Sequence, residues 1–336
     1  DWIRAGRCRR VIVIAGDDPT SGSIAPWISG GMFASGAATI EGNLRLAALP
    51  FDRRRNGLIM GMGAAALVVE AQEALIERGM TPICEILATV IANSAFHGTR
   101  LNIDHVNQVM DRVLREAETR YGIQRSEIAP HTVFISHETY TPARGGSASA
   151  EIHALRYTFG DQADKVIIAN TKGYTGHAMG VGIEDVLAAK ALEYQIVPPI
   201  AHVNDGFEPD PELGNLNLAR GGKADVHYAL RLGAGFGSQI AMALLRKVGT
   251  AGQRIDHTRY QKWLSNLSGY PNPTLEVVQH TLRIKNEGIP PQPPAASEWQ
   301  YGQVPKAWAV DAPPTADAFL AHSESILSAS QSDTTP

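Results

Sequence analysis

The stretch DHVNQVMDRVLREAETRYG (104–122), followed by HTVFIS (131–136), shows the alternation of helix and strand that determines the fold. In the first segment apolar residues recur every three or four positions, which predicts an amphipathic helix that ends at Gly122. The second segment is a short β-branched and aromatic run, which is typical of a buried strand. A helix followed by a buried strand predicts α/β architecture, with helices packed on a sheet.

The same pattern extends along the chain in both directions. Residues 1–10 are predicted to be the last turns of a helix, with Gly6 near its end and basic residues in the final turn. We expect further strands at 9–16, 64–70, 83–92 and 165–170, further helices at 71–79, 147–160 and 182–195, and two antiparallel strands at 224–232 and 238–247.

Composition excludes several classes of protein. The net charge of −4 leaves no broad basic surface for nucleic acid, and no apolar run is long enough to span a bilayer. The two cysteines, Cys8 and Cys84, form neither a disulfide framework nor a metal-ligand spacing, so we expect a protein of the reducing cytoplasm without a metal. Because the chain begins at Asp1 without an initiator Met, we expect it to be part of a longer polypeptide.

The character of the sequence changes from about Thr250. The stretch 254–284 is predicted to form short helical pieces that dock through Trp263 and Leu264. Beyond Pro290 the chain is rich in Pro, Ala, Ser and Asp, a composition typical of a flexible linker to another domain.

Three short segments combine polar side chains with the ends of predicted strands, where active-site groups of α/β proteins usually lie. They are ISHETYT (135–141), NTKGYTGHAMG (170–180) and LGAGFGSQI (232–240). Taken singly, each has a simpler explanation: a histidine after a strand is more often a hydrogen-bonded structural residue, a lysine is usually solvated, and a glycine-rich turn usually only turns. Their combination and order carry the functional argument.

In this order the segments resemble β-ketoacyl synthases, in which His-Gly-Thr-x-Thr, Lys-x-x-x-x-His and Gly-Phe-Gly-Gly recur. The segment PFDRRRNGLIMGMGAAALVVE (50–70) is similar to another stretch of that family, and the resemblance covers about residues 1–248. It implies an acyltransferase that performs a decarboxylative Claisen condensation between an acyl thioester and a malonyl-type extender, in fatty-acid or polyketide biosynthesis.

The resemblance also implies the fold, a thiolase-like αβαβα sandwich made of two similar halves. Residues 1–80 correspond to the end of the N-terminal half, which is incomplete in this chain, and 81–249 to the C-terminal half. Residues 250–289 are expected to dock as a segment after the synthase, and 290–336 to form the linker.

The family's chemistry assigns roles to the polar residues. His137 and His177 would each present a ring N–H to the enolate that forms when the malonyl thioester loses CO2. Lys172 would orient the site and help set the protonation of the histidines, with Glu151 as its partner.

Three further residues are implied by the same resemblance. The backbone N–H of Phe236 would supply half of the oxyanion hole for the acyl thioester, and its side chain would gate the acyl pocket. Thr139 and Thr141 would bind the phosphopantetheine arm, unless they make only local turn bonds. No cofactor is expected to bind directly, because substrates arrive on the phosphopantetheine of acyl carrier protein. The expected partners are that carrier, the missing upstream half of the same domain and a second copy in a homodimer.

The sequence departs from the family most clearly at the nucleophilic cysteine, which is expected shortly upstream of Asp1. Cys8 falls at the end of a predicted helix, where the helix dipole disfavours a thiolate, and Cys84 lies in a buried strand. Neither replaces the nucleophile, so the fragment alone is expected to be inactive. Glu138 and Tyr140 stand where glycine and a small residue are usual, which predicts a reshaped pantetheine tunnel.

Related enzymes fit less well. A thiolase needs a second cysteine near its C-terminal glycines, and GAGFGSQI (233–240) has none. Initiating synthases use a His and an Asn, whereas this chain has two His and a Lys. A non-catalytic partner subunit, of the chain-length-factor type, stays open. The residue at the nucleophile position, upstream of Asp1, discriminates the two.

Overall fold

The computed structural model describes residues 2–97, 100–141, 146–178, 182–249 and 254–293. The chain divides into two compact units, of which the first comprises Asp1–Val11, Val68–Met80 and Ile255–Pro336, and the second Ile12–Leu67 and Thr81–Arg254. All the candidate site residues belong to the second unit. Among the described helices, none has the length and hydropathy needed to cross a membrane.

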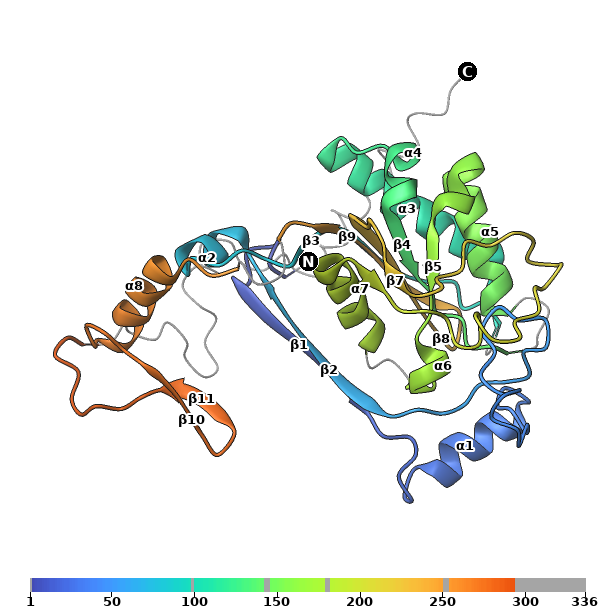
Figure 1. Ribbon diagram of the computed structural model, residues 1–336, viewed down its shortest axis with the longest axis horizontal. Coiled ribbons are helices and arrows are strands. Elements are labelled where there is room, and N and C mark those ends of the chain that lie inside the picture. The colour runs from blue at the N-terminus through green and yellow to red at the C-terminus, as the bar shows by residue number, and fades with distance from the viewer. Residues whose placement is uncertain (1, 98–99, 142–145, 179–181, 250–253, 294–336) are drawn as a thin grey trace. The chain divides into compact units, whose positions relative to one another are not determined.

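A five-stranded mixed sheet, in the order β3-β9-β8-β4-β5, forms the framework of the second unit (Figure 1). The strand β9 is antiparallel to both of its neighbours, whereas β8, β4 and β5 run parallel to one another. The antiparallel pair expected near residues 224–247 is therefore confirmed. The strands are β3 (Cys84–Asn93), β4 (Thr132–Ile135), β5 (Ile167–Ala169), β8 (Tyr228–Gly235) and β9 (Gln239–Lys247).

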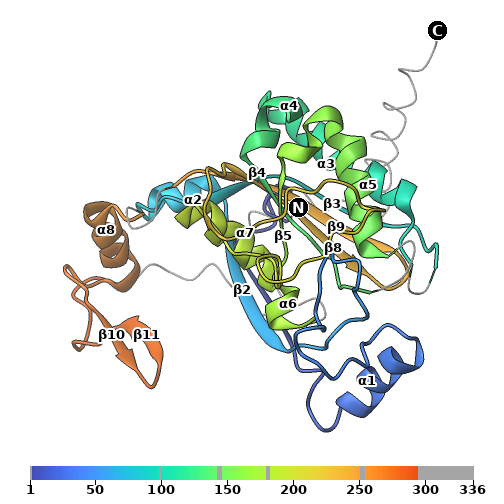
Figure 2. The same cartoon turned by 45° about the vertical axis from the view of Figure 1, so that its right-hand side comes forward.

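Helices cover both faces of this sheet (Figure 2). On β4, Phe134 joins the core beneath α3 (Ile103–Tyr121) and α5 (Ser147–Phe159), while Val133 and Ile135 point to the opposite face and pack with α7 (Ile183–Tyr194). This alternation follows from the two-residue period of a strand. It explains why the strand carries no polar residue between Thr132 and Ile135: both of its faces are buried.

The helix α3 shows why the sequence signal was clear. Its N-cap, Asn102, accepts a hydrogen bond from the backbone N–H of His105 at 3.2 Å, and Gly122 ends it in the left-handed conformation at φ 65°. Both caps satisfy backbone groups that the helix leaves unpaired. The apolar stripe in between, including Met110 and Val113, is fully buried.

Shorter elements complete the chain. Residues 2–7 make the paired hydrogen bonds of a helix C-terminus, from Gly6 N–H to the Ile3 carbonyl at 3.0 Å and from Arg7 N–H to the Trp2 carbonyl at 2.9 Å. The remaining elements are β1 (Arg10–Asp17), α1 (Ala25–Ala34), β2 (Gly63–Glu70), α2 (Gln72–Glu77), α4 (Arg125–Ile128), η1 (Ala129–His131), η2 (Gly160–Lys165), α6 (Lys172–Thr175), β6 (Ile196–Val197) and β7 (Gly222–Lys223). The strands β1 and β2 pair with each other, as do β6 and β7.

The segment after Arg254 is only partly helical. In the first unit α8 (His257–Ser268) packs on α2, with Leu264 buried and the Arg78 guanidinium 5.7 Å from the ring centroid of Trp263. The helical expectation is wrong for 275–284, where β10 (Leu275–Val278) and β11 (Thr281–Ile284) form a hairpin. The reason is local: Gln279 and His280 both adopt positive φ, which suits a two-residue hairpin turn. Most of the expected linker, 294–336, lies outside the described residues, and the domain boundaries stay predictions.

Candidate active site

Two histidines from distant parts of the sequence meet at the ends of the central strands. His137 follows β4 and His177 follows α6, and their ring centroids are 5.6 Å apart with the planes at 84°. A backbone pairing fixes the second histidine: His177 N–H donates to the Ile59 carbonyl at 2.7 Å, and Gly61 N–H donates to the His177 carbonyl at 3.1 Å. A side chain at Gly61 would collide with the Thr175 carbonyl, since an added Cβ would lie 2.0 Å from that oxygen.

Lys172 lies beside this pair, almost fully buried at the start of α6. Its Nζ is 2.6 Å from Oε1 of Glu184, which is in the first turn of α7. The ion-pair partner of Lys172 is therefore Glu184 and not the expected Glu151, whose negative charge still opposes the lowering of the lysine's pKa by burial. The Glu151 carboxylate accepts hydrogen bonds from the Ser136 hydroxyl at 2.6 Å and from the His137 backbone N–H at 3.2 Å. Glu151 therefore holds the strand end that carries His137.

A second buried cation completes the charge network. Arg231 on β8 places one guanidinium nitrogen 3.4 Å from Glu184 and another 3.1 Å from Asp185. Glu184 thus lies between two cations, Lys172 and Arg231. Neither Glu184 nor Arg231 was identified from the sequence. For Arg231 the available signal was a charged residue inside an otherwise apolar, buried strand, since a buried charge requires a partner.

The environment keeps both histidines neutral. Burial lowers the pKa of His137 well below its usual value, and the positive charge of Lys172 adds to the effect. Burial and Lys172 also lower the pKa of His177, to about 4. Burial opposes ionisation of Glu184, but Lys172 and Arg231 overcome it and lower the pKa of that carboxyl to about 2. At neutral pH each imidazole therefore has one N–H to donate and Glu184 is ionised. Burial lowers the pKa of Lys172, and the negative charge of Glu184 opposes that shift.

The depressed histidine pKa values predict acid sensitivity. The unfolded chain binds more protons than the folded one between the ordinary pKa of 6.5 and the folded value of about 4, so the free energy of unfolding should fall as pH drops through this window. For His177 the loss is at most roughly 3 kcal/mol. Urea unfolding of the wild type and of His177→Gln, at pH values between 6.5 and about 4, measures this loss in the free energy of unfolding. The variant should show a shallower pH dependence, whereas His257→Gln, at an exposed position on α8, should not. Identical slopes for the wild type and His177→Gln would contradict the assignment.

The loop after His137 is held by the two residues that depart from the family pattern. Glu138 is fully buried, and its carboxylate accepts a hydrogen bond at 2.5 Å from the hydroxyl of Ser147, the first residue of α5. Tyr140, also fully buried, has φ 47°, and its hydroxyl donates to the Lys172 carbonyl at 3.2 Å. These side chains tie the loop to α5 and α6. The expected reshaping of the pantetheine tunnel stays a prediction.

The remaining predicted site residues are Thr139, Thr141 and Phe236. Thr139 is buried, and its backbone N–H donates to the Ser147 hydroxyl at 3.2 Å, while Thr141 is half-buried. Phe236 lies in the turn between β8 and β9 with 49% of its surface exposed. The roles given to these three residues stay predictions.

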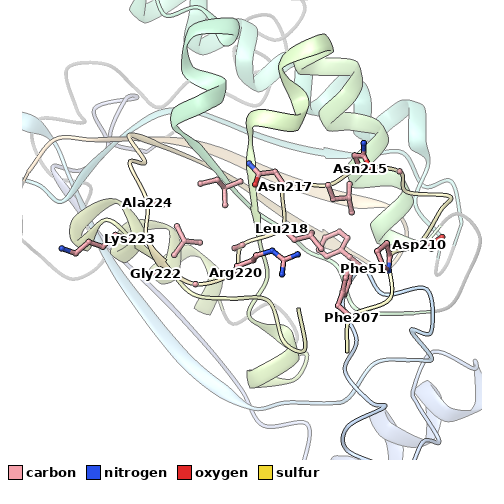
Figure 3. A pocket seen from close by; sticks show the side chains of 17 residues that line it. Phe51, Phe207, Asp210, Asn215, Asn217, Leu218, Arg220, Gly222, Lys223 and Ala224 are labelled. Atoms are coloured by element: carbon pink, nitrogen blue, oxygen red, sulfur yellow. The ribbon is translucent and has the colours of Figure 1, made fainter. Parts of the chain in front are cut away.

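A pocket of about 560 Å³ lies elsewhere in the same unit, beside β5 (Figure 3). The aromatic rings of Phe51 and Phe207 lie at one end of it, and Arg220 and Lys223 come from the connection between β5 and β8. Its lining includes none of the residues His137, Lys172 and His177. The pocket is therefore separate from the histidine site.

Comparisons with known proteins agree with the motifs. A family model described as "Beta-ketoacyl synthase, C-terminal domain" matches residues 83–204, which confirms the expected family for this part of the chain. The 3-oxoacyl-[acyl-carrier-protein] synthase 2 of Staphylococcus aureus (strain COL) is 29% identical over 221 residues, which are 65% of this chain and 50% of that protein. The synthase of the same name from Coxiella burnetii is 32% identical over 168 residues, 48% of this chain and 38% of that protein. The chain thus spans about half the length, or less, of these curated relatives.

Solved structures extend the likeness to the fold. The ketosynthase complex titled "type II PKS acyl-carrier protein in complex with its ketosynthase bound to the hexaketide" is similar at a TM-score of 0.64 and 26% identity, covering 74% of this chain and 58% of that one. A β-ketoacyl synthase from Burkholderia phymatum STM815 gives a TM-score of 0.64 at 23% identity, with coverage of 74% and 57%. These neighbours confirm the predicted α/β, thiolase-like fold class.

Proposed function

We propose that this chain, whose residues 83–204 are a β-ketoacyl synthase C-terminal domain, supplies the decarboxylation half of a condensing site. The observation that carries the proposal is the pair of imidazoles, His137 and His177, with ring centroids 5.6 Å apart beside a buried Lys172–Glu184 ion pair. The reaction is a decarboxylative Claisen condensation in fatty-acid or polyketide biosynthesis.

The chemistry follows from where charge develops. When the bond between the malonyl α-carbon and its carboxylate breaks, CO2 leaves and the electron pair moves onto the thioester oxygen as an enolate. Two N–H donors aimed at that oxygen stabilise it most in the transition state, and neutral imidazoles can donate without being consumed as acids. The α-carbon of the enolate then attacks the carbonyl of an acyl thioester, and the thiolate that carried the acyl group leaves.

Lys172 acts on this site as a positioning residue. Its charge favours the neutral form of both histidines, and its backbone carbonyl accepts a hydrogen bond from the Tyr140 hydroxyl. Glu184 balances that charge in the buried interior. The backbone N–H of Phe236 contributes to the oxyanion hole, and Thr139 and Thr141 contact the pantetheine arm.

The acyl group is carried by a cysteine other than the two in this sequence. Burial raises the pKa of Cys84 to about 11, so its reactive thiolate is scarce at neutral pH. Acyl carrier protein is the proposed donor of both substrates. The solved complex of a ketosynthase with its acyl-carrier protein supports this partner by similarity. We further propose a homodimer and a cytoplasmic location.

The protein that carries this chain should release CO2 from malonyl-acyl carrier protein and form a β-ketoacyl product when given an acyl thioester. Radiolabelled acyl thioester should label neither Cys8 nor Cys84, and Cys8→Ser/Cys84→Ser should retain full activity. Covalent, site-specific labelling of either cysteine would overturn the assignment. Failure of the folded protein to release CO2 by itself, with release appearing only when an active ketosynthase is added, would instead support a non-catalytic partner subunit.

A further inference from the structure

A second group of histidines lies at the opposite end of the central strands. Thr132 of β4 and Tyr228 of β8 are register partners in neighbouring parallel strands, and His131 and His227 each precede one of them. The two histidines therefore occupy adjacent positions one step before the ladder, and His227 N–H donates to the His131 carbonyl at 2.8 Å. Their rings stack with centroids 5.0 Å apart and an interplanar angle of 19°.

One carboxylate faces both rings. Asp225 places one oxygen 3.1 Å from Nδ1 of His131 and the other 2.9 Å from Nε2 of His227. One ligand atom from each of the three residues lies within 4.8 Å of the others. The side chains are between 43% and 69% exposed, so an ion can reach the cluster from solvent.

We propose that His131, Asp225 and His227 form a binding site for a divalent transition-metal ion, with Zn²⁺ as the best match. Two imidazole nitrogens and one carboxylate oxygen are ligands that zinc accepts, and three protein ligands leave a fourth position for water. The backbone bond between the two histidines fixes their spacing before an ion arrives, which lowers the cost of ordering the ligands. The competing explanation is an ordinary hydrogen-bond network around Asp225, which would form without any metal ion.

The site's place in the fold defines its role. His131 precedes β4 and His137 follows it, so the cluster lies at the opposite end of this strand from the catalytic candidates, about 13 Å of strand away. The ion is therefore too distant to polarise a substrate at the histidine pair. Bound there, it links the starts of β4 and β8 and stabilises the folded chain, because it binds the native arrangement and not the unfolded one.

Calorimetric titration of the metal-free protein with Zn²⁺ tests the proposal, with Co²⁺ as a second probe whose visible absorption reports the ligand geometry. One equivalent should bind, and melting temperature should rise with added Zn²⁺. His131→Asn and His227→Gln should each weaken binding by at least about 10- to 100-fold, since losing a direct ligand costs no less than losing a supporting hydrogen bond. His257→Gln, an exposed histidine elsewhere, serves as the matched control.

Circular dichroism of each variant without metal shows whether it has folded. Asp225→Asn is a third variant for the Zn²⁺ titration in case a histidine variant is unstable. It keeps both imidazole rings and removes only the anionic ligand. The proposal is overturned if the folded double variant His131→Asn/His227→Gln binds Zn²⁺ with the same stoichiometry and affinity as the wild type. It is equally overturned if the wild type binds none.

Discussion

Replacing His177 by Ala, in the protein that carries this chain, is expected to slow CO2 release from a malonyl thioester by about 100- to 1000-fold. Acyl transfer to the nucleophile should be largely unaffected. The reason is that decarboxylation builds negative charge on the malonyl thioester oxygen, where His177 is proposed to donate. Acyl loading is proposed to use a different oxyanion hole, made from backbone N–H groups. Separate measurements of acyl-enzyme formation and of CO2 release distinguish the two steps.

Two comparison variants show whether the effect of His177→Ala is specific to decarboxylation. Lys172→Ala should be less selective between the two steps, because it disturbs both histidines together and leaves Glu184 without its partner in the buried site. His153→Ala should impair neither, since His153 lies on α5 and its ring contacts Asn107 at 3.1 Å, away from the pair. An equal loss of both steps in His177→Ala would show that the histidine has been given the wrong role.

The elements that sequence reasoning located well are those in which local and tertiary preferences agree. The helix predicted at 104–122 is observed at Ile103–Tyr121, because its apolar stripe, its Asn102 cap and Gly122 all specify the same boundaries. The strands β4 and β8 likewise contain apolar runs that are buried on both faces. The hairpin at 275–284 was missed because its turn, Gln279–His280, contains no glycine and so gives no turn signal.

The candidate site shows a different limit. The motifs identified His137, Lys172 and His177, but partner choice among buried charges depends on distances that sequence spacing does not encode. The family resemblance pointed to Glu151 as the partner of Lys172, whereas the first turn of α7 brings Glu184 to it. Glu138 was recognised only as a departure from the family. Its bond to Ser147 shows that it anchors the loop to α5.

The buried Lys172–Glu184 pair predicts a large effect on stability. Glu184→Gln keeps the size of the side chain but removes the negative charge between Lys172 and Arg231. Both cations would stay in a low-dielectric interior without that counter-charge, which typically destabilises a protein by about 3–5 kcal/mol. The free energy of unfolding at neutral pH, from urea titration monitored by circular dichroism, measures the loss.

A matched control lies on the same helix. Glu193 is also buried, but it pairs at 2.6 Å with Lys190, whose side chain is 47% exposed and can return to water when the carboxylate is removed. Glu193→Gln should therefore cost no more than about 1 kcal/mol. Adding Lys172→Met to Glu184→Gln should recover part of the lost stability, since the double variant removes the stranded cation. If Glu184→Gln were no more destabilising than Glu193→Gln, Glu184 would not be the group that neutralises the buried charge of Lys172. Lys172 would then have to be neutral or solvated in the folded protein.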